Sequence, residues 1–251
     1  SALAQCNILD NPGFETIGSP PNPSGPRGWR PFNAARHRSV DDGLGPAFVR
    51  TGTYSIELPS DPTQAFVGFS TDVLNPVTLM YDFNPRFRGG RGDVVVSGFY
   101  VIPSDRPFAG ISAGGASAGI KLEFRRENTS IHFAAEDLSI SGHTGDQWTP
   151  FSMRVTVAQQ EALGGMFPPF ALRASVLPFI FPANMDTGTI FWDDLSYVQC
   201  LADWNTDSQT NSSDISAFLT SWLASVQNVD LDACQRQIRI RGQGFFDIVQ
   251  Q

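Results

Sequence analysis

Short runs in which apolar and polar residues alternate dominate the first 200 positions of the chain. In one of them, Ile120, Leu122 and Phe124 alternate with Lys121 and Glu123. Successive side chains of a β-strand point to opposite faces, so the three apolar residues share one buried face. Seven strand-like runs are separated by turn signals rich in Gly and Pro: 53–58, 93–102, 119–125, 130–135, 151–157, 170–181 and 189–199. Many short strands with such turns predict an all-β, antiparallel two-sheet sandwich.

The segments around these runs carry little helical signal. Residues 7–15 predict a short first strand that ends in a Pro-Gly turn. Residues 18–28 predict a loop, because Pro, Gly, Ser and Asn dominate them. Residues 158–163 predict one or two helical turns, and no other convincing helix pattern precedes residue 203.

A different pattern begins after residue 200. The segment DWNTDSQTNSSD has oxygen ligands at the positions of a calcium loop: Asp203, Asn205, Asp207, the carbonyl of Gln209, and Asp214. The apolar residues that follow repeat on one helical face over about three turns. The segment therefore predicts a calcium loop that runs into a helix. The alternative is a polar turn in which Asp214 caps the helix without a metal.

The composition argues against nucleic acid as a partner and against a membrane-spanning segment. A hydrophobic content of 41% supports a packed core, and a net charge of −8 argues against nucleic acid, which requires a concentrated basic surface. No apolar stretch is as long as a membrane span. Residues 1–5, SALAQ, resemble the small-residue end of a secretory signal peptide, so the protein is expected to be secreted, extracellular or at the cell surface.

A set of motifs resembles one family of β-sandwiches. In chain order they are NPGFE at 11–15, Trp29, RTGTYSIEL at 50–58, VSGFYV at 96–101, the Trp in GDQWTPFSMRV, and G-x-x-x-W-D-D-L at 188–195. Together they resemble jelly-roll carbohydrate-binding modules with a galactose-binding-like fold, over residues 6–200. The resemblance implies an antiparallel jelly roll and a glycan ligand.

The same resemblance implies a structural calcium ion between the first and last strands. Its candidate ligands are Glu15, Asp193 and Asp194, near the segment 51–53. The alternative is that the two aspartates cap a strand end or pair with an arginine. Both interpretations remain open at the level of the sequence.

Residues 201–226 are similar to the first repeat of a dockerin, a small module of two calcium loop–helix repeats. The chain departs from that pattern at Ser208, where Gly normally permits the sharp turn. In the second repeat, Cys234, Arg236 and Arg241 stand where ligands are expected. Residues 201–251 are therefore predicted to be a degenerate, dockerin-like helical appendage.

Three cysteines in an exported chain predict one disulfide and one remaining thiol. Cys6 begins the first predicted strand and Cys200 follows the last one. If those strands are neighbours, as in many jelly rolls, a Cys6–Cys200 bond would join the two ends of the sandwich. The alternative pairing, Cys200–Cys234, would enclose the appendage instead.

The sequence favours a binding protein over an enzyme. The three histidines are far apart and no Gly-x-Ser-x-Gly motif is present. Scattered acids do not establish the paired carboxylates of a glycosidase. Sandwiches bind glycans through flat aromatic rings, and the candidates outside predicted strand cores are Trp29, Phe32, Tyr81, Phe83 and Phe87.

These observations predict a secreted, non-catalytic glycan-binding or surface-associated protein with structural calcium. The alternative is a self-assembling subunit of an extracellular fibre or surface layer. It is suggested by the final segment, QIRIRGQGFFDIVQQ, which alternates like a strand. Such a strand can add to the sheet edge of a neighbouring protomer and so form a homo-oligomer or filament.

Overall fold

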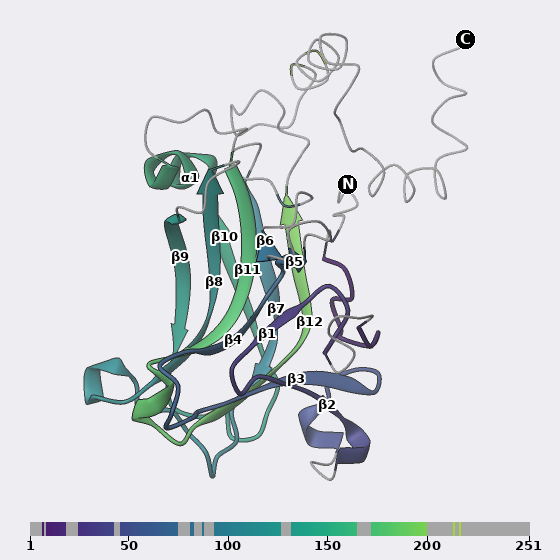
Figure 1. Cartoon of the computed structure of the whole chain (residues 1–251), viewed down its shortest axis with the longest axis vertical. Coiled ribbons are helices and arrows are strands. Elements are labelled where there is room, and N and C mark those ends of the chain that lie inside the picture. The colour runs from purple at the N-terminus through teal and green to yellow at the C-terminus, as the bar shows by residue number, and fades with distance from the viewer. Residues whose placement is uncertain are drawn as a thin grey trace.

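A computed structural model describes residues 7, 9–18, 25–42, 46–74, 81–82, 87, 93–126, 132–164, 172–199, 213 and 216 (Figure 1). These residues form two five-stranded antiparallel sheets. The predicted all-β, two-sheet antiparallel sandwich is therefore confirmed.

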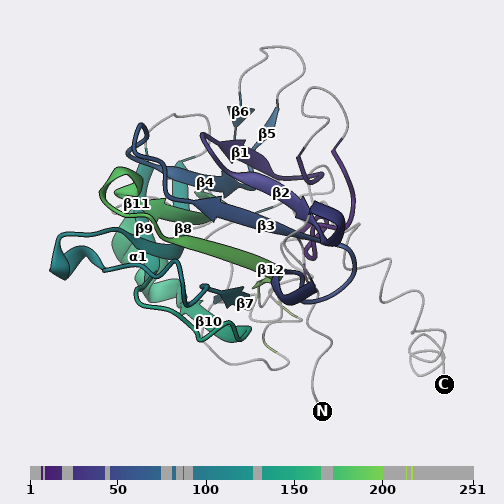
Figure 2. The same cartoon turned by 90° about the horizontal axis from the view of Figure 1, so that it is seen from below.

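We call the first sheet sheet I. Its strands, in spatial order, are β1 (Arg30–Phe32), β4 (Val67–Ser70), β11 (Leu172–Phe181), β8 (Ser117–Arg126) and β9 (His132–Ile140). Sheet II contains β10 (Thr149–Val155), β7 (Val94–Val101), β12 (Thr189–Gln199), β3 (Tyr54–Pro59) and β2 (Arg36–Ser39). A two-stranded pair of β5 (Val73–Leu74) and β6 (Tyr81–Asp82) lies apart from both sheets in Figure 2.

The inward-facing residues of both sheets form one hydrophobic core. Ala174, Val176 and Ile180 of β11 belong to it, as do Ile190 and Trp192 of β12. The alternating apolar residues that predicted buried faces are therefore the ones that form the core. The residues between them point to the outer faces of the sheets.

Helical structure among the described residues is limited to short segments. The 3₁₀ turns are η1 (Val40–Asp42), η2 (Pro46–Phe48), η3 (Ile111–Ala113) and η5 (Ala183–Met185). The helix α1 (Val157–Gly164) lies against β8 and β9 and confirms the short helix predicted for 158–163. None of the helices in the described ranges is long and apolar enough to span a membrane.

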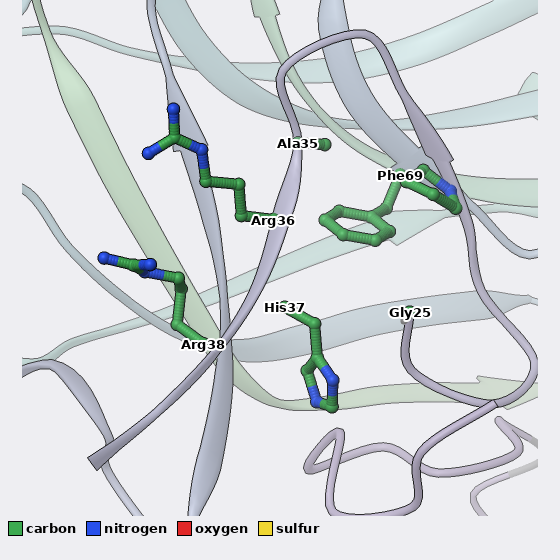
Figure 3. Close-up of a pocket in the computed structure, with 7 residues that line it drawn as sticks. Gly25, Ala35, Arg36, His37, Arg38 and Phe69 are labelled. Carbon is green, nitrogen blue, oxygen red and sulfur yellow. The ribbon is translucent and has the colours of Figure 1, made fainter. Parts of the chain in front are cut away.

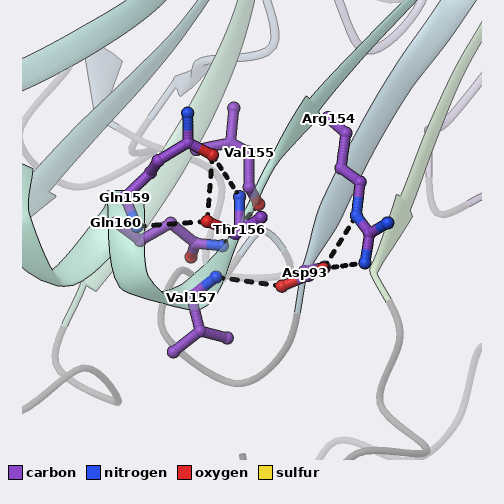
Figure 4. Close-up of polar contacts among 7 residues, drawn as sticks. All are labelled: Asp93, Arg154, Val155, Thr156, Val157, Gln159 and Gln160. Atoms are coloured by element: carbon purple, nitrogen blue, oxygen red, sulfur yellow. Dashed lines mark hydrogen bonds and ion pairs between the residues drawn. The ribbon is translucent and has the colours of Figure 1, made fainter. Parts of the chain in front are cut away.

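A capping box explains where α1 begins. Thr156 Oγ1 accepts the N–H of Gln159 at 3.2 Å, and Gln159 Oε1 accepts the N–H of Thr156 at 2.9 Å (Figure 4). Asp93 adds a second cap, because its Oδ1 accepts the N–H of Val157 at 3.0 Å. Its other carboxylate oxygen pairs with Arg154 of β10. The start of α1 is thus tied to the residue that precedes β7.

The beginning of the chain lies beside the last strand of the sandwich. Asn7 forms an antiparallel bridge with Val198. Its side chain donates to the carbonyl of Leu195 at 3.1 Å and accepts the N–H of Tyr197 at 3.0 Å. Residues 7 and 9–15 form this bridge and turns, where a short strand was predicted.

Several predictions concern residues outside the described ranges. They are the calcium loop (Asp203, Asn205, Asp207, Gln209 and Asp214), the cysteines (Cys6, Cys200 and Cys234), the aromatic residue Phe83, and the final segment 237–251. Ser213 and Ser216 are described, and both are helical and exposed.

Candidate functional site

An aromatic patch lies on the outer face of sheet I. Because Val176 and Ile180 point into the core, Phe179 and Phe181 of the same strand point outward. Phe179 is paired with Gly68 on one side and Gly119 on the other. We define the aromatic patch as Phe32, Phe66, Phe179 and Phe181.

Glycines in the neighbouring strands give the rings their position. A Cβ on Gly119 would lie 2.9 Å from Cε1 of Phe179, and a Cβ on Gly68 would lie 3.1 Å from Cζ of Phe66. Each ring therefore lies directly against a glycine. The two rings are nearly parallel, with centroids 6.3 Å apart and planes inclined by 9°.

The patch is part covered and part open. Phe181 is 50% exposed, Phe32 and Phe66 are half-buried, and Phe179 is 5% exposed. Phe32 meets Phe66 edge to face at a centroid distance of 5.9 Å. Exposed or half-exposed phenylalanine rings are costly in water and are found where a protein binds an apolar or flat surface.

Charged side chains border these rings. The Arg30 guanidinium lies 4.3 Å from the centroid of Phe32, and Lys121 Nζ lies 5.6 Å from that of Phe179. Each cation also has an acidic neighbour: Arg30 is 3.8 Å from Asp72, and Lys121 is 3.7 Å from Glu123. The patch thus combines flat apolar faces with hydrogen-bond donors and acceptors, as binding sites for polar small molecules do.

The structure separates the aromatic residues that the sequence grouped together. Phe32 belongs to the patch. Trp29 and Phe87 are 4% and 1% exposed and belong to the core, so they are not part of the patch. Tyr81 lies in β6, where only its backbone is described, and Phe83 lies outside the described residues. Phe66, Phe179 and Phe181 were missed, although the alternation in 170–181 places Phe179 and Phe181 on the face opposite Ile180.

A second cluster lies where the first segment meets β12, and we call it the seam cluster. A β-bulge between Asp193 and Ser196 shifts the register of β12 against β7, and Asp194 adopts a left-handed backbone with φ of 50°. The bulge turns two consecutive acids toward the segment 50–54. Asp193 is fully buried and Asp194 is half-buried.

The acids of the seam cluster are bound by backbone amides. Asp193 accepts the N–H groups of Arg50, Thr51 and Asp194 at 2.9, 3.1 and 2.7 Å. Glu15 accepts those of Thr53 and Tyr54 at 2.8 and 3.1 Å.

Asp194 completes the cluster. It accepts the hydroxyl of Thr51 at 2.8 Å and pairs with the Arg50 guanidinium. The structure therefore brings together all three acids that the resemblance selected, and it places them against the segment 51–53.

Close packing at Gly52 keeps Glu15 in place. Gly52 has a φ of 67°, and a Cβ there would overlap the Glu15 carboxylate. The pKa of Asp193 is raised to about 7, because the effects of burial and of the Asp194 charge exceed the opposing effect of the three amide donors. Burial also lowers the pKa of His37, whose ring nitrogen lies 2.8 Å from the carbonyl of Phe14.

The seam cluster does not have the arrangement of a metal centre. All six carboxylate oxygens of Glu15, Asp193 and Asp194 accept a hydrogen bond from a protein donor. Within the described ranges, no three His, Cys, Asp or Glu side chains are placed to hold one ion. Calcium requires six to eight oxygen ligands that point toward it. The residues of the seam cluster therefore do not fit the calcium ion that the resemblance implies.

A cavity of about 270 Å³ opens at the edge of the sandwich, where the chain passes from β1 to β2 (Figure 3). Ala35, His37 and Phe69 line it. The guanidinium groups of Arg36 and Arg38 point away from Phe69 in this view, and they lie 3.8 and 3.0 Å from Glu57. The cavity therefore has a mixed polar and apolar wall, and the guanidinium groups of its two arginines pair with Glu57.

Comparison with known proteins gives distant matches. No protein-family model matches the chain, and no curated protein matches it. The family 61 carbohydrate-binding module TmCBM61, solved with β-1,4-galactotriose, is 14% identical with a TM-score of 0.41, over 77% of this chain and 98% of that one.

Two further structures are similar to a comparable degree. The CBM22-1 xylan-binding domain of Paenibacillus barcinonensis Xyn10C is 12% identical with a TM-score of 0.40, over 78% of this chain and 97% of that one. The arabinose-bound α-L-arabinofuranosidase MgGH51 is 15% identical with a TM-score of 0.47, over 77% of this chain and 26% of that one. All three TM-scores lie below 0.5.

Proposed function

We propose that the protein is a secreted, non-catalytic glycan-binding protein that holds an oligosaccharide on the aromatic patch. The observation that carries this proposal is the gathering of Phe32, Phe66, Phe179 and Phe181 on one outer sheet face. The apolar C–H faces of a sugar ring match flat aromatic rings, because both lose water-exposed apolar surface on contact.

The polar neighbours of the patch suit the same ligand. Sugar hydroxyls both donate and accept hydrogen bonds. Arg30 and Lys121 supply donors and Glu123 supplies acceptors on the same side of sheet I as the rings, while the buried Asp72 holds Arg30 in position. Charged hydrogen-bond partners are stronger than neutral ones and fix the orientation of a ligand. In this proposal the rings provide affinity, and Arg30, Lys121 and Glu123 select the sugar.

Retention of the full chain in gels that contain a polysaccharide tests the proposal, with β-1,4-galactan and xylan as the first ligands. Phe181→Ala and Phe32→Ala should each weaken retention by about fivefold to tenfold, because one stacking ring is worth about 1 kcal/mol. Ile17→Ala is a matched control, since Ile17 is also 50% exposed but lies outside the patch. Equal losses in the patch variants and the control, or no retention on either polysaccharide, would contradict the proposal.

Calcium remains part of the proposal at the loop 203–214. Its ligands would be the side chains of Asp203, Asn205, Asp207 and Asp214 and the carbonyl of Gln209. There the ion would stabilise the following helix and take no part in sugar binding.

A further inference from the structure

The seam cluster holds more negative than positive charge. Glu15, Asp193 and Asp194 contribute three carboxylates to it. Arg50 is the cation paired with Asp194, and its guanidinium lies 3.4 Å from the centroid of the Phe99 ring. A buried carboxylate requires either a counter-charge or several hydrogen-bond donors.

Backbone amides supply the donors. Three N–H groups point at Asp193 and two at Glu15. Each N–H presents the positive end of its dipole to the carboxylate. A calcium site needs the opposite arrangement, in which backbone carbonyl oxygens converge on the ion.

Three carbonyls of the first segment also accept hydrogen bonds from protein donors. The carbonyl of Pro12 accepts the N–H of Leu195 at 2.9 Å, and that of Asn11 accepts the N–H of Phe14 at 3.1 Å. The carbonyl of Phe14 is bound by His37 at 2.8 Å. The first segment thus directs these oxygens at protein donors.

We propose that Arg50 and the five backbone amides stabilise the carboxylates of the seam cluster in place of a calcium ion, so that the seam closes without a metal. The stacking of Arg50 on Phe99 fixes the guanidinium beside Asp194. The segment 50–54 then joins the first segment, through Glu15, to the last strand, through Asp193 and Asp194.

Thermal unfolding of the full chain in millimolar CaCl₂ and in EDTA tests this inference. The variant Asp203→Ala/Asp207→Ala is the background, because it removes ligands of the predicted loop site and leaves the seam cluster intact. We expect its melting temperature to differ by less than about 1 °C between the two conditions. An ion held at about 100 times its Kd would raise it by about 5 to 10 °C, and such a rise would overturn the proposal.

Calorimetric titration of the unmodified chain with CaCl₂ provides a second measurement that does not depend on that variant. We expect any heat of calcium binding to be unchanged in Glu15→Gln, because the calcium site that we propose is the loop 203–214. Loss of a calcium-binding event in Glu15→Gln would overturn the proposal. Sugar retention is measured separately, so failure of the glycan proposal leaves this outcome unaffected.

Replacement of the arginine tests its role directly. Arg50→Gln should lower the melting temperature by about 3 to 8 °C, equally in CaCl₂ and EDTA. Arg106→Gln is the matched control, because Arg106 is similarly exposed, at 35% against 31%, and pairs with the exposed Asp105. Equal effects of the two substitutions, or rescue of Arg50→Gln by calcium, would overturn the proposal.

Discussion

The ring of Phe179 lies against the backbone of Gly119 in the adjacent strand, so closely that a Cβ there would be 2.9 Å from the ring. The same missing side chain leaves room for the carbonyl of Leu138 from β9. Gly119 is therefore the position at which three strands of sheet I approach one another. Its lack of a side chain decides where the ring of Phe179 can lie.

Gly119→Ala should lower the free energy of unfolding by about 1 to 3 kcal/mol, because the added methyl group meets backbone that cannot move away. Denaturant unfolding measures this change. The substitution should also weaken polysaccharide retention, since Phe179 must shift. Ser152→Ala is the control, because Ser152 is an exposed residue of β10 in the other sheet and should change stability by less than about 0.5 kcal/mol. An equally small effect at Gly119 would mean that the contact is not tight.

The long strands could be predicted because they contain enough residues to show alternation. The runs 119–125 and 189–199 correspond to β8 and β12. The strands β1, β4 and β5 were not predicted because they contain two to four residues each, too few for a period to be seen. Their positions depend on pairing with distant strands, such as β4 with β11, which local pattern does not encode.

In the candidate sites, too, some features could be predicted from the sequence and others could not. Motif order selected Glu15, Asp193 and Asp194, and the structure brings them together. The bulge at Asp194 and the stacking of Arg50 on Phe99 depend on register, so the sequence could not show which groups bind the acids. Phe179 and Phe181 were missed for a different reason. Phenylalanines in strands were assigned to the core, although half of the positions in a strand face outward.

Thr156→Ala should lower stability by about 1 kcal/mol, because it removes the hydroxyl that caps α1. Thr156→Ser keeps an oxygen in the same place and should restore most of the loss. Denaturant unfolding of the two variants and the parental chain gives the comparison. Equal losses in both variants would show that the methyl group, and not the cap, stabilises this turn.

Non-reducing peptide mapping should recover Cys6 linked to Cys200, leaving Cys234 as the free thiol. The supporting observation is the bridge between Asn7 and Val198, which places the start of the chain beside the end of β12. Recovery of a Cys200–Cys234 peptide would instead assign the disulfide to the appendage. Reduction should lower the melting temperature in the first case, because a bond that closes so long a loop restricts the unfolded chain.

Asp193 should make stability depend on pH between about 4 and 7. Burial raises the pKa of this carboxyl to about 7 in the folded protein, above its ordinary value of 3.8. Between these two values the folded state binds more protons than the unfolded state, so stability falls as pH rises and levels off above about 7. The slope from this single group is at most about 1.4 kcal/mol per pH unit.

Asp193→Asn isolates that contribution, because it removes the titration and keeps an oxygen acceptor for the segment 50–51. The difference in unfolding free energy between the parental chain and the variant should shift in favour of the variant as pH rises from 4 to 7. Hydrogen bonds lower the pKa of other carboxyls, such as Asp61 and Asp146. These groups are present in both proteins, so their contributions cancel in the difference in unfolding free energy. A difference that stays constant over this range would show that the amides hold Asp193 ionised, and the stabilisation of the seam cluster would then be independent of pH.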